Sequence, residues 1–429
     1  MSIAVRVNLA TDPALPQRDL LLDLGEVTKR FSARLGLDGP VRIDSCARVR
    51  IKYSPGVSLR LLHRIKIDAA SYTVAAHTFT GGRSKSAFER GKEKVIPCDR
   101  LAPIVWDAEL DTVYWTFPNE RKIANLSVLL TPPAGLARLF DNQWTRSRIV
   151  AYAPEKCVTA ECLNDEDEVL AYAKVYSDGE PPSFATYDQL RQSISAVRSS
   201  LRIPRALAYS EEYRTLFLEP VVGRRITHLS SADRADGFRH LGAALAALHS
   251  LPVPDGLPPF ERLDPGHLQK AAGIIGQARP DVRKLAEDVA KELCEMWAAP
   301  TDSQVCLHGD VHPKNGIIQN SRAALIDLDQ AGAGPAAADL GSLLAALRYL
   351  RCVGTLSPAD ERGLRAGFLS GYREVRELPE RSYLRWHVAA ALLAERALRS
   401  VSRIRQEGLR RLNELLMESR RLLTEELYE

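Results

Sequence analysis

The stretch His308-Gly309-Asp310-Val311-His312-Pro313-Lys314-Asn315, followed by Leu325-Ile326-Asp327-Leu328-Asp329, decides the fold of this 429-residue chain. It places three polar residues, Asp310, Asn315 and Asp327, within eighteen positions. An apolar run precedes each polar cluster, at 305–307 and again at 323–326, which predicts two buried strands. A charged loop between two such strands is the simplest alternative, but so many fixed residues rarely arise together by chance.

This combination of residues is what phosphoryl transfer from ATP requires. One aspartate takes up the proton of the attacking hydroxyl, while an asparagine and a second aspartate hold the magnesium that bridges the phosphates. The spacing is that of a kinase catalytic loop followed by a metal-binding strand. The stretch therefore predicts a kinase that uses ATP and Mg²⁺.

The pattern H-G-D-x-H-x-x-N…I-D-x-D resembles the aminoglycoside phosphotransferase and choline kinase family, over about residues 139–400. The resemblance implies an α+β, two-lobed protein-kinase-like fold, with a β-rich small lobe and a mainly helical large lobe. It also implies that Asp310 is the catalytic base and that Asn315 and Asp327 are the magnesium ligands.

Further landmarks follow the family's order along the chain. His308 would brace the catalytic loop rather than act as a base. Asp329 stands where many members carry an acid that assists the metal or the substrate. Asp339 would hydrogen-bond the catalytic loop, and the segments 241–249 and 368–372 resemble two helices of the large lobe.

The nucleotide-binding residues are predicted from the segments before the loop. Lys174 lies in the β-like run 169–176, where a lysine is costly to bury unless it meets an anion. We therefore expect it to contact the α- and β-phosphates, the alternative being a strand lysine whose charged end reaches solvent. The next helix offers Asp188 as its partner but no glutamate, which departs from the family. By the resemblance, backbone groups near Glu219 and Val221 would meet the adenine edge.

The hairpin expected over 149–158 has neither a G-x-G-x-x-G motif nor a Walker A motif. Backbone amides at a tight turn can still bind phosphate. The missing glycines therefore do not exclude phosphate binding at this turn.

Residues 40–130 repeat landmarks of residues 139–230 in the same order, at offsets of 99, 97 and 103. The paired segments are 50–55 with 149–154, 75–82 with 172–179, and 112–115 with 215–218. We hypothesise a second, degenerate copy of the small lobe, with His77 in place of the lysine. It would be a cap packed on the true lobe or a dimer surface. An unrelated N-terminal cap, such as maltokinase-like kinases carry, is the alternative.

These observations predict three domains. Residues 1–135 would form an extra N-terminal β-rich cap domain, possibly the duplicate. Residues 136–222 would form the nucleotide-binding small lobe, and residues 223–429 the helical large lobe with the catalytic loop and the acceptor site.

The acceptor side is expected in the basic, helical segment 383–423, whose apolar residues recur at spacings of three and four. Few acids accompany its many arginines, whereas a polycationic acceptor needs an acidic pocket. The balance favours a neutral sugar, an amino sugar with one charge, or an anionic acceptor. Trp386 would stack on a sugar ring, unless it is a core tryptophan, and Glu395 and Asp329 would contact hydroxyl or amine groups.

Composition limits the remaining classes. A net charge of +4 gives no argument for a nucleic-acid partner. The sequence contains no run of eighteen apolar residues, so no membrane-spanning helix is predicted. Seven irregularly spaced cysteines and a first octet without an apolar signal core favour a reduced, cytoplasmic protein. A monomer or a homodimer is expected.

The sequence thus predicts phosphorylation of a small-molecule hydroxyl, with a sugar or amino sugar as the favoured acceptor. An aminoglycoside or choline-type kinase is one alternative, and a non-catalytic nucleotide-binding regulator is another. A protein acceptor is disfavoured because no activation loop resembling those of protein kinases separates Asp327 from Asp339.

Overall fold

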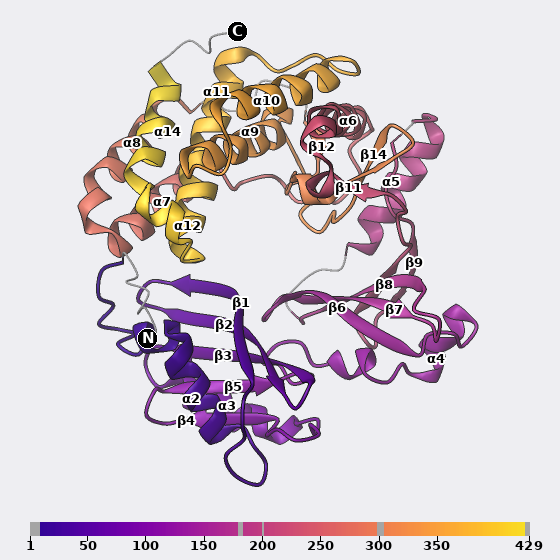
Figure 1. Cartoon of the computed structure of the whole chain (residues 1–429). Coiled ribbons are helices and arrows are strands. Elements are labelled where there is room, and N and C mark those ends of the chain that lie inside the picture. Colours follow the sequence, from indigo (N-terminus) through magenta and orange to yellow (C-terminus); the bar gives the residue numbers. More distant parts are fainter. Residues whose placement is uncertain (1–8, 179–182, 200, 298–303, 425–429) are drawn as a thin grey trace. The chain divides into compact units, whose positions relative to one another are not determined.

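The computed structural model describes residues 9–178, 183–199, 201–297 and 304–424. Gly179, which ends one repeated segment, and the first octet used above lie outside these ranges. The chain forms two compact units (Figure 1). The first contains residues 1–182, 207–218 and 402–404, and the second contains the rest. The three-domain division stays a prediction, whereas the α+β class is confirmed.

The first unit is built on two five-stranded sheets with the same strand order. The first sheet runs β1-β2-β3-β5-β4 and the second β6-β7-β8-β10-β9. The strands of the first are β1 (Ser45–Ser54), β2 (Ser58–Ile67), β3 (Ala70–Phe79), β4 (Ile104–Asp107) and β5 (Thr112–Thr116). Those of the second are β6 (Arg146–Ala153), β7 (Cys157–Leu163), β8 (Val169–Tyr176), β9 (Ala206–Ser210) and β10 (Thr215–Leu218).

The two sheets also share their strand register. Strands β2 and β7 correspond at an offset of 99, β3 and β8 at 97, and β5 and β10 at 103, which are the offsets of the repeated segments. The matching pairs are Arg60–His77 with Thr159–Lys174, and His77–Val113 with Lys174–Leu216. A shared register means that equivalent residues face equivalent sides of their sheets, because side chains alternate along a strand.

One hydrophobic core joins the two sheets through non-equivalent faces. The first sheet contributes Ala75 and Trp115, which lie on the same face as His77. The second contributes Ala173 and Val175, which lie on the face opposite to Lys174. The face of the first sheet that carries His77 corresponds to the face of the second sheet that carries Lys174. This His77 face is therefore covered by the opposite face of the second sheet, which carries Ala173 and Val175.

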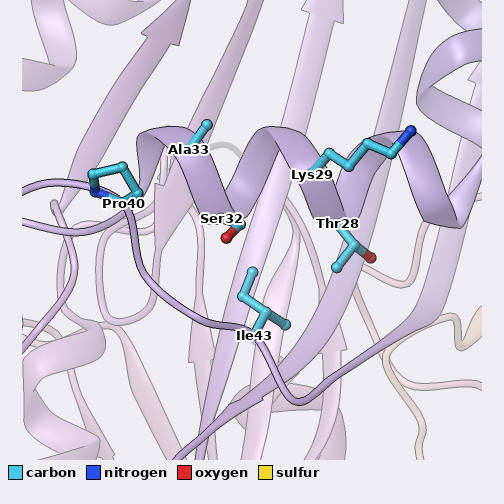
Figure 2. Close-up of a pocket in the computed structure, with 6 residues that line it drawn as sticks. All are labelled: Thr28, Lys29, Ser32, Ala33, Pro40 and Ile43. Atoms are coloured by element: carbon cyan, nitrogen blue, oxygen red, sulfur yellow. The ribbon is translucent and has the colours of Figure 1, made fainter.

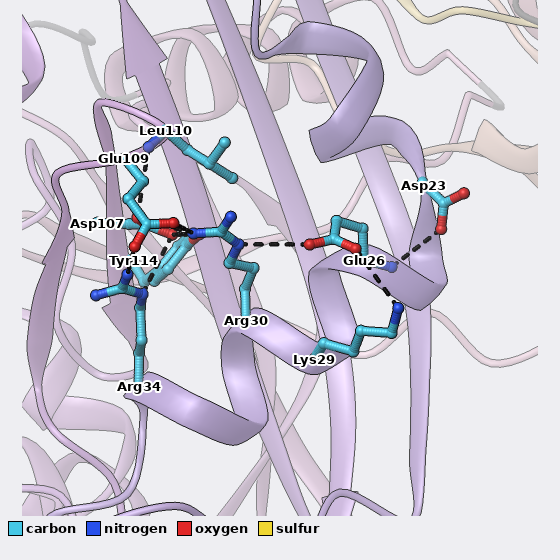
Figure 3. Close-up of polar contacts among 9 residues, drawn as sticks. All are labelled: Asp23, Glu26, Lys29, Arg30, Arg34, Asp107, Glu109, Leu110 and Tyr114. Atoms are coloured by element: carbon cyan, nitrogen blue, oxygen red, sulfur yellow. Dashed lines mark hydrogen bonds and ion pairs between the residues drawn. The ribbon is translucent and has the colours of Figure 1, made fainter.

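Helix α2 (Leu24–Arg34) covers the other face of the first sheet. It begins where the Asp23 carboxylate accepts a hydrogen bond from the Glu26 amide (3.0 Å), and Phe31 packs edge-on against His63. Figure 3 shows Arg30 and Arg34 reaching the buried Asp107 and its neighbour Glu109. This polar network and the apolar contacts together seat the helix on the sheet.

Short helices complete the first unit. They are α1 (Arg18–Leu22), α3 (Arg83–Gly91), η1 (Lys92–Lys94), η2 (Leu126–Leu129), α4 (Ala134–Ala137) and η3 (Arg138–Phe140).

The second unit is mainly helical and carries the catalytic loop. Its helices are α5 (Phe184–Ala196), η4 (Ile226–His228), α6 (Ser231–His249), α7 (Pro265–Ala278), η5 (Pro280–Val282), α8 (Arg283–Glu295), η6 (Pro313–Asn315), α9 (Ala336–Cys352), α10 (Pro358–Arg373), α11 (Arg381–Ala391), the π-helical turn η7 (Leu392–Ala397), α12 (Leu398–Ser402), α13 (Gln406–Arg410) and α14 (Leu412–Thr424). Its strands are β11 (Arg224–Arg225), β12 (Val305–Leu307), β13 (Gly316–Gln319), β14 (Arg322–Leu325) and β15 (Gly332–Gly334).

The predicted strands around the loop are present. β12 pairs with β15, and β14 pairs with β13. Within the described ranges, no helix combines the length and apolar character that a bilayer crossing requires.

Candidate active site

The catalytic loop leaves β12 and closes in the short helix η6, which brings Asp310 and Asn315 together. The Asn315 side-chain amide donates to the Asp310 carbonyl (3.1 Å), and the Asn315 backbone N–H donates to the His312 carbonyl (2.8 Å). Asn315 is buried, whereas about a quarter of the Asp310 side chain is exposed. The loop thus presents one partly exposed carboxylate on a hydrogen-bonded frame.

A buried carboxylate, Asp339 of α9, fixes the start of this loop. Its two oxygens accept from the backbone N–H groups of His308 (2.6 Å) and Gly309 (2.9 Å). The ring of His249 lies 3.2 Å from Asp339 and 2.9 Å from the Tyr372 hydroxyl. Burial alone would raise the pKa of Asp339, but His249 and the loop amides outweigh it and keep the pKa below its ordinary value.

His308 connects the loop to the second polar cluster. Its Nε2 lies 3.0 Å from the Ile326 carbonyl, and its Nδ1 accepts from the Asp310 N–H at 3.4 Å. The side chain is fully buried and both ring nitrogens are engaged with backbone. This arrangement supports a bracing role for His308.

Gly309 is a backbone requirement of the loop. Its φ is +75°, and an added Cβ would lie 1.8 Å from the Gln330 carbonyl oxygen. Arg262 donates to the Gly309 carbonyl (2.7 Å) and to the Gln330 side chain (2.5 Å), which closes the loop against the next segment. Sequence reasoning did not find Arg262, because its position far from the motif carries no local signal.

Asn315 and Asp327 are brought close by a backbone hydrogen bond, in which the Ile326 N–H donates to the Asn315 carbonyl (2.9 Å). Asp327 follows at φ +67°, a left-handed conformation that is uncommon for a residue other than glycine. Because the Asn315 side-chain nitrogen is used by Asp310, its oxygen remains on the other edge of the amide. An amide oxygen and a carboxylate suit Mg²⁺, which takes few protein ligands and keeps waters and phosphates.

No group of three or more His, Cys, Asp or Glu side chains suited to a metal occurs within the described part of the chain. The magnesium ligands Asn315 and Asp327 stay a prediction. Asp329, two residues further on, accepts from the Ser183 hydroxyl at 2.9 Å, just before α5. This contact gives Asp329 a structural task, and its substrate role stays a prediction.

Two arginines, Arg396 of η7 and Arg399 of α12, give the loop a positive neighbourhood. Arg399 Nη1 lies 4.0 Å from Asp310 Oδ1, and Arg396 is buried behind it. Burial lowers the pKa of His312 to about 4, with further contributions from Lys314, Arg396 and Arg399. The charge near Asp310 is therefore largely cationic.

Two residues predicted to contact the acceptor are buried, and Trp386 fits the core alternative. Trp386 is 6% exposed, and its indole N–H donates to the Leu293 carbonyl (2.9 Å), so its ring is a core element. Glu395 is 7% exposed and accepts from the Ser342 hydroxyl (2.7 Å) and from Arg396 (3.1 Å). Helical spacing could not show which side of α11 and η7 is buried, so a core position resembled a binding position.

Lys174 is placed as predicted in β8 and is 6% exposed. It lies opposite Thr159 of β7 and Leu216 of β10, on the face of the second sheet that points away from the core shared by the two sheets. A buried lysine on such a face is compatible with an anionic ligand. The phosphate contact stays a prediction.

The predicted turn between β6 and β7 does not offer free amides. The Glu155 N–H donates to the Glu120 carboxylate (3.0 Å), and the Lys156 N–H donates to the Ala153 carbonyl (3.0 Å). These two amides are therefore occupied in this conformation. A contribution of the hairpin to nucleotide binding would then come from its side chains or from β8, the strand that pairs with β7.

The remaining nucleotide-binding predictions have local partners. Glu219 and Arg205 exchange two backbone-centred hydrogen bonds, in which the Glu219 N–H donates to the Arg205 carbonyl (2.9 Å) and the Arg205 N–H donates to the Glu219 carboxylate (2.8 Å). The Glu219 amide is thus occupied in this conformation, and the adenine contacts near Glu219 and Val221 stay a prediction. Asp188 is exposed on α5 and accepts from Gln192 (2.8 Å), so its pairing with Lys174 stays a prediction.

A shallow groove elsewhere lacks the required chemistry. Figure 2 shows that it lies along α2, and it is lined by Thr28, Lys29, Ser32, Ala33, Pro40 and Ile43. It offers no carboxylate to accept a proton or bind a metal, so the catalytic loop remains the candidate site.

These features define a small-molecule kinase with an α+β fold. Residues 166–378 match the family model described as "Phosphotransferase enzyme family". This match confirms the resemblance to phosphotransferases noted from the catalytic loop. A comparison with curated proteins gave no match.

Solved structures similar to this chain include three kinases. Amicoumacin kinase hAmiN is 13% identical, with 67% of this chain and 92% of that chain covered and a TM-score of 0.47. An aminoglycoside phosphotransferase from Streptomyces rimosus is 19% identical, with 61% and 97% covered and a TM-score of 0.41. A choline kinase from Cryptosporidium parvum is 11% identical, with 65% and 89% covered and a TM-score of 0.44. The family model, not these distant likenesses, carries the assignment.

Proposed function

We propose that this chain catalyses ATP- and magnesium-dependent transfer of a phosphoryl group to a hydroxyl of a small molecule. The observation that carries the proposal is the partly exposed Asp310 carboxylate on a loop fixed by Asn315, His308 and the buried Asp339. Such a loop keeps a general base in one place, and positioning supplies much of the catalysis in phosphoryl transfer.

Each residue then has a distinct task. Asp310 orients the acceptor hydroxyl and accepts its proton. Asn315 and Asp327 would hold the magnesium, which neutralises charge on the phosphates when bound. Lys174 would bind the α- and β-phosphates, and the backbone near Val221 would meet the adenine edge.

The acceptor is best sought among neutral, singly charged or anionic molecules, with a sugar or amino sugar first. Arg399 stands 4.0 Å from Asp310, so a cationic group brought to the same carboxylate would meet a like charge. This neighbourhood disfavours an aminoglycoside or a choline-type acceptor. The sugar preference no longer rests on Trp386 or Glu395, because both are buried.

Turnover is tested by ADP release from ATP and Mg²⁺ with glucose, glucosamine, maltose, homoserine, choline and several aminoglycosides. Asp310→Asn keeps the shape of the side chain and removes the base, so we expect turnover to fall by roughly 10²–10⁴-fold with nucleotide affinity nearly unchanged. Asp255→Asn, in an exposed turn, is the matched control and should retain full turnover.

Retained turnover in Asp310→Asn would contradict the assignment of the base. Turnover confined to aminoglycosides would contradict the argument from Arg399. Nucleotide binding without turnover on any acceptor would favour a non-catalytic regulator.

A further inference from the structure

The first sheet has the plan of the nucleotide-binding sheet but a closed binding face. His77 occupies the position of Lys174, opposite Arg60 as Lys174 is opposite Thr159. The face that carries His77 also carries Ala75 and Trp115, which are packed in the core against the second sheet. No space for a nucleotide remains on a face that another sheet covers.

The place of an anion beside His77 is taken by Glu155 of the second sheet's own hairpin. Glu155 Oε1 lies 3.4 Å from His77 Nδ1 and 2.5 Å from Arg121 Nε, and Oε2 lies 2.5 Å from Arg60 Nη1. The Glu155 side chain is 5% exposed. Three groups of the first sheet and its following segment therefore surround one carboxylate of the second.

The backbone of this turn is held as well. The Glu155 N–H donates to the Glu120 carboxylate, whose other oxygen accepts from the N–H groups of Lys122 (2.7 Å) and Ile123 (3.2 Å). Both the main chain and the side chain of Glu155 are thus bound by residues outside the second sheet.

Glu155 has a left-handed backbone conformation, which favours glycine over glutamate. Its φ is +64°, and the equivalent residue of the first hairpin, Gly56, has a φ of +67°. Glycine adopts this left-handed conformation without a steric penalty, whereas other residues do not. A glutamate at this position is therefore explained by its contacts and not by the turn.

We propose that the first sheet is an inactive copy of the nucleotide-binding sheet, and that Arg60 and Arg121 position the β6–β7 hairpin by holding Glu155. Strand β7 of this hairpin is the direct neighbour of β8, and Thr159 of β7 pairs with Lys174, the lysine proposed to bind the nucleotide. Arg60, Arg121 and Glu155 are positioning residues: they act on the nucleotide through β7 and β8. This inference rests on the proposed function.

The expected consequence is weaker binding of nucleotide with a smaller change in the chemical step. Arg121→Ala should raise the Kd and KM for Mg·ATP about tenfold or more, since small displacements of positioning elements have large effects. The kcat should change much less, because Asp310 lies in the other unit. Arg121→Lys restores the charge and should recover part of the affinity.

Glu155→Gly distinguishes the loss of the contacts of Glu155 with Arg60 and Arg121 from a loss of the turn itself. It removes the carboxylate but supplies the residue that suits the turn, so the hairpin should form without being held. We expect it to bind Mg·ATP as weakly as Arg121→Ala. Arg100→Ala, which removes the exposed ion pair with Asp68 in the first sheet's region, is the control and should bind like wild type.

The test is calorimetric titration of the full-length variants with Mg·ATP, together with hydrogen exchange of residues 146–163. Weaker binding and faster exchange in Arg121→Ala and Glu155→Gly, but not in Arg100→Ala, would support the proposal. Wild-type binding by both variants would overturn the positioning role alone. Absence of Mg·ATP binding by the wild type would overturn the proposed function and this role with it.

Discussion

The two sheets of the first unit share strand order and register, yet they differ at one decisive pair of positions. Lys174 lies on a face of the second sheet that is outside the shared core, and His77 lies on the equivalent face of the first sheet, which is inside it. The closed face of the first sheet therefore holds His77 within the polar cluster of Arg60, Arg121 and Glu155, where the second sheet keeps Lys174 outside the shared core.

The comparison also shows what an extra sheet contributes to a kinase. A separate cap would have its own core, but here one core contains residues of both sheets. The carboxylate of Glu155 links them in addition. The first sheet thus packs against the second through the face that carries His77, which corresponds in register to the Lys174 face.

We expect the largest effect from a substitution in the core that the two sheets share. Trp115→Ala removes a side chain that is 4% exposed between the sheets and should destabilise the protein by about 3–5 kcal/mol. Because one core serves both sheets, urea unfolding should show both becoming labile together, as followed by hydrogen exchange. Trp297→Ala, at an exposed tryptophan, should change stability by no more than about 0.5 kcal/mol. Lability confined to the first sheet would contradict a common core.

A second pair of variants compares the equivalent positions directly. Lys174→Met should weaken Mg·ATP binding by roughly 10–150-fold, the value of a hydrogen bond from a charged group to phosphate. His77→Gln should leave the affinity within about twofold, because its face is closed and its effect is confined to the Glu155 contact. Calorimetric titration measures both. A larger loss from His77→Gln than from Lys174→Met would reverse the roles of the two sheets.

The smallest expected effect depends on pH. Burial alone would raise the pKa of Glu155, but His77, Arg121 and Arg60 outweigh it and hold the pKa below its ordinary value. A lowered pKa gives stability that is complete above the unfolded-state value of about 4.3 and is lost as the pH falls below it. Glu155→Gln should therefore cost about 1.5–3 kcal/mol at pH 7 and progressively less below pH 4.

Urea unfolding of wild type and Glu155→Gln at a series of pH values checks this prediction. Asp165→Asn, in an exposed turn of the same unit, serves as the control. A difference between Glu155→Gln and wild type that persists unchanged at pH 3 would show that charge is not what holds the hairpin.

The sequence predicted most of the fold because its signals were local. The run 169–176 has the same bounds as the observed strand β8, and the two polar clusters follow β12 and β14 as expected. The weaker landmarks around His249, Asp339 and Tyr372 also proved to be one hydrogen-bonded network.

The errors arose where burial depends on distant elements. Trp386 and Glu395 have the residue types of a sugar site, but their surroundings are α8 and α9, which no local pattern specifies. No local pattern distinguishes Arg399 from the other arginines of 383–423, and only the fold brings it within 4.0 Å of Asp310. The occupied amides of the β6–β7 turn depend on Glu120, a residue 35 positions away.

Hydrogen exchange with and without Mg²⁺ and a non-hydrolysable ATP analogue distinguishes the two sheets as nucleotide-binding sites. We expect the nucleotide to slow exchange in residues 146–176 of the second sheet and to leave residues 45–79 of the first sheet unchanged. Slower exchange in residues 45–79 without any change in residues 146–176 would show instead that the first sheet binds the nucleotide.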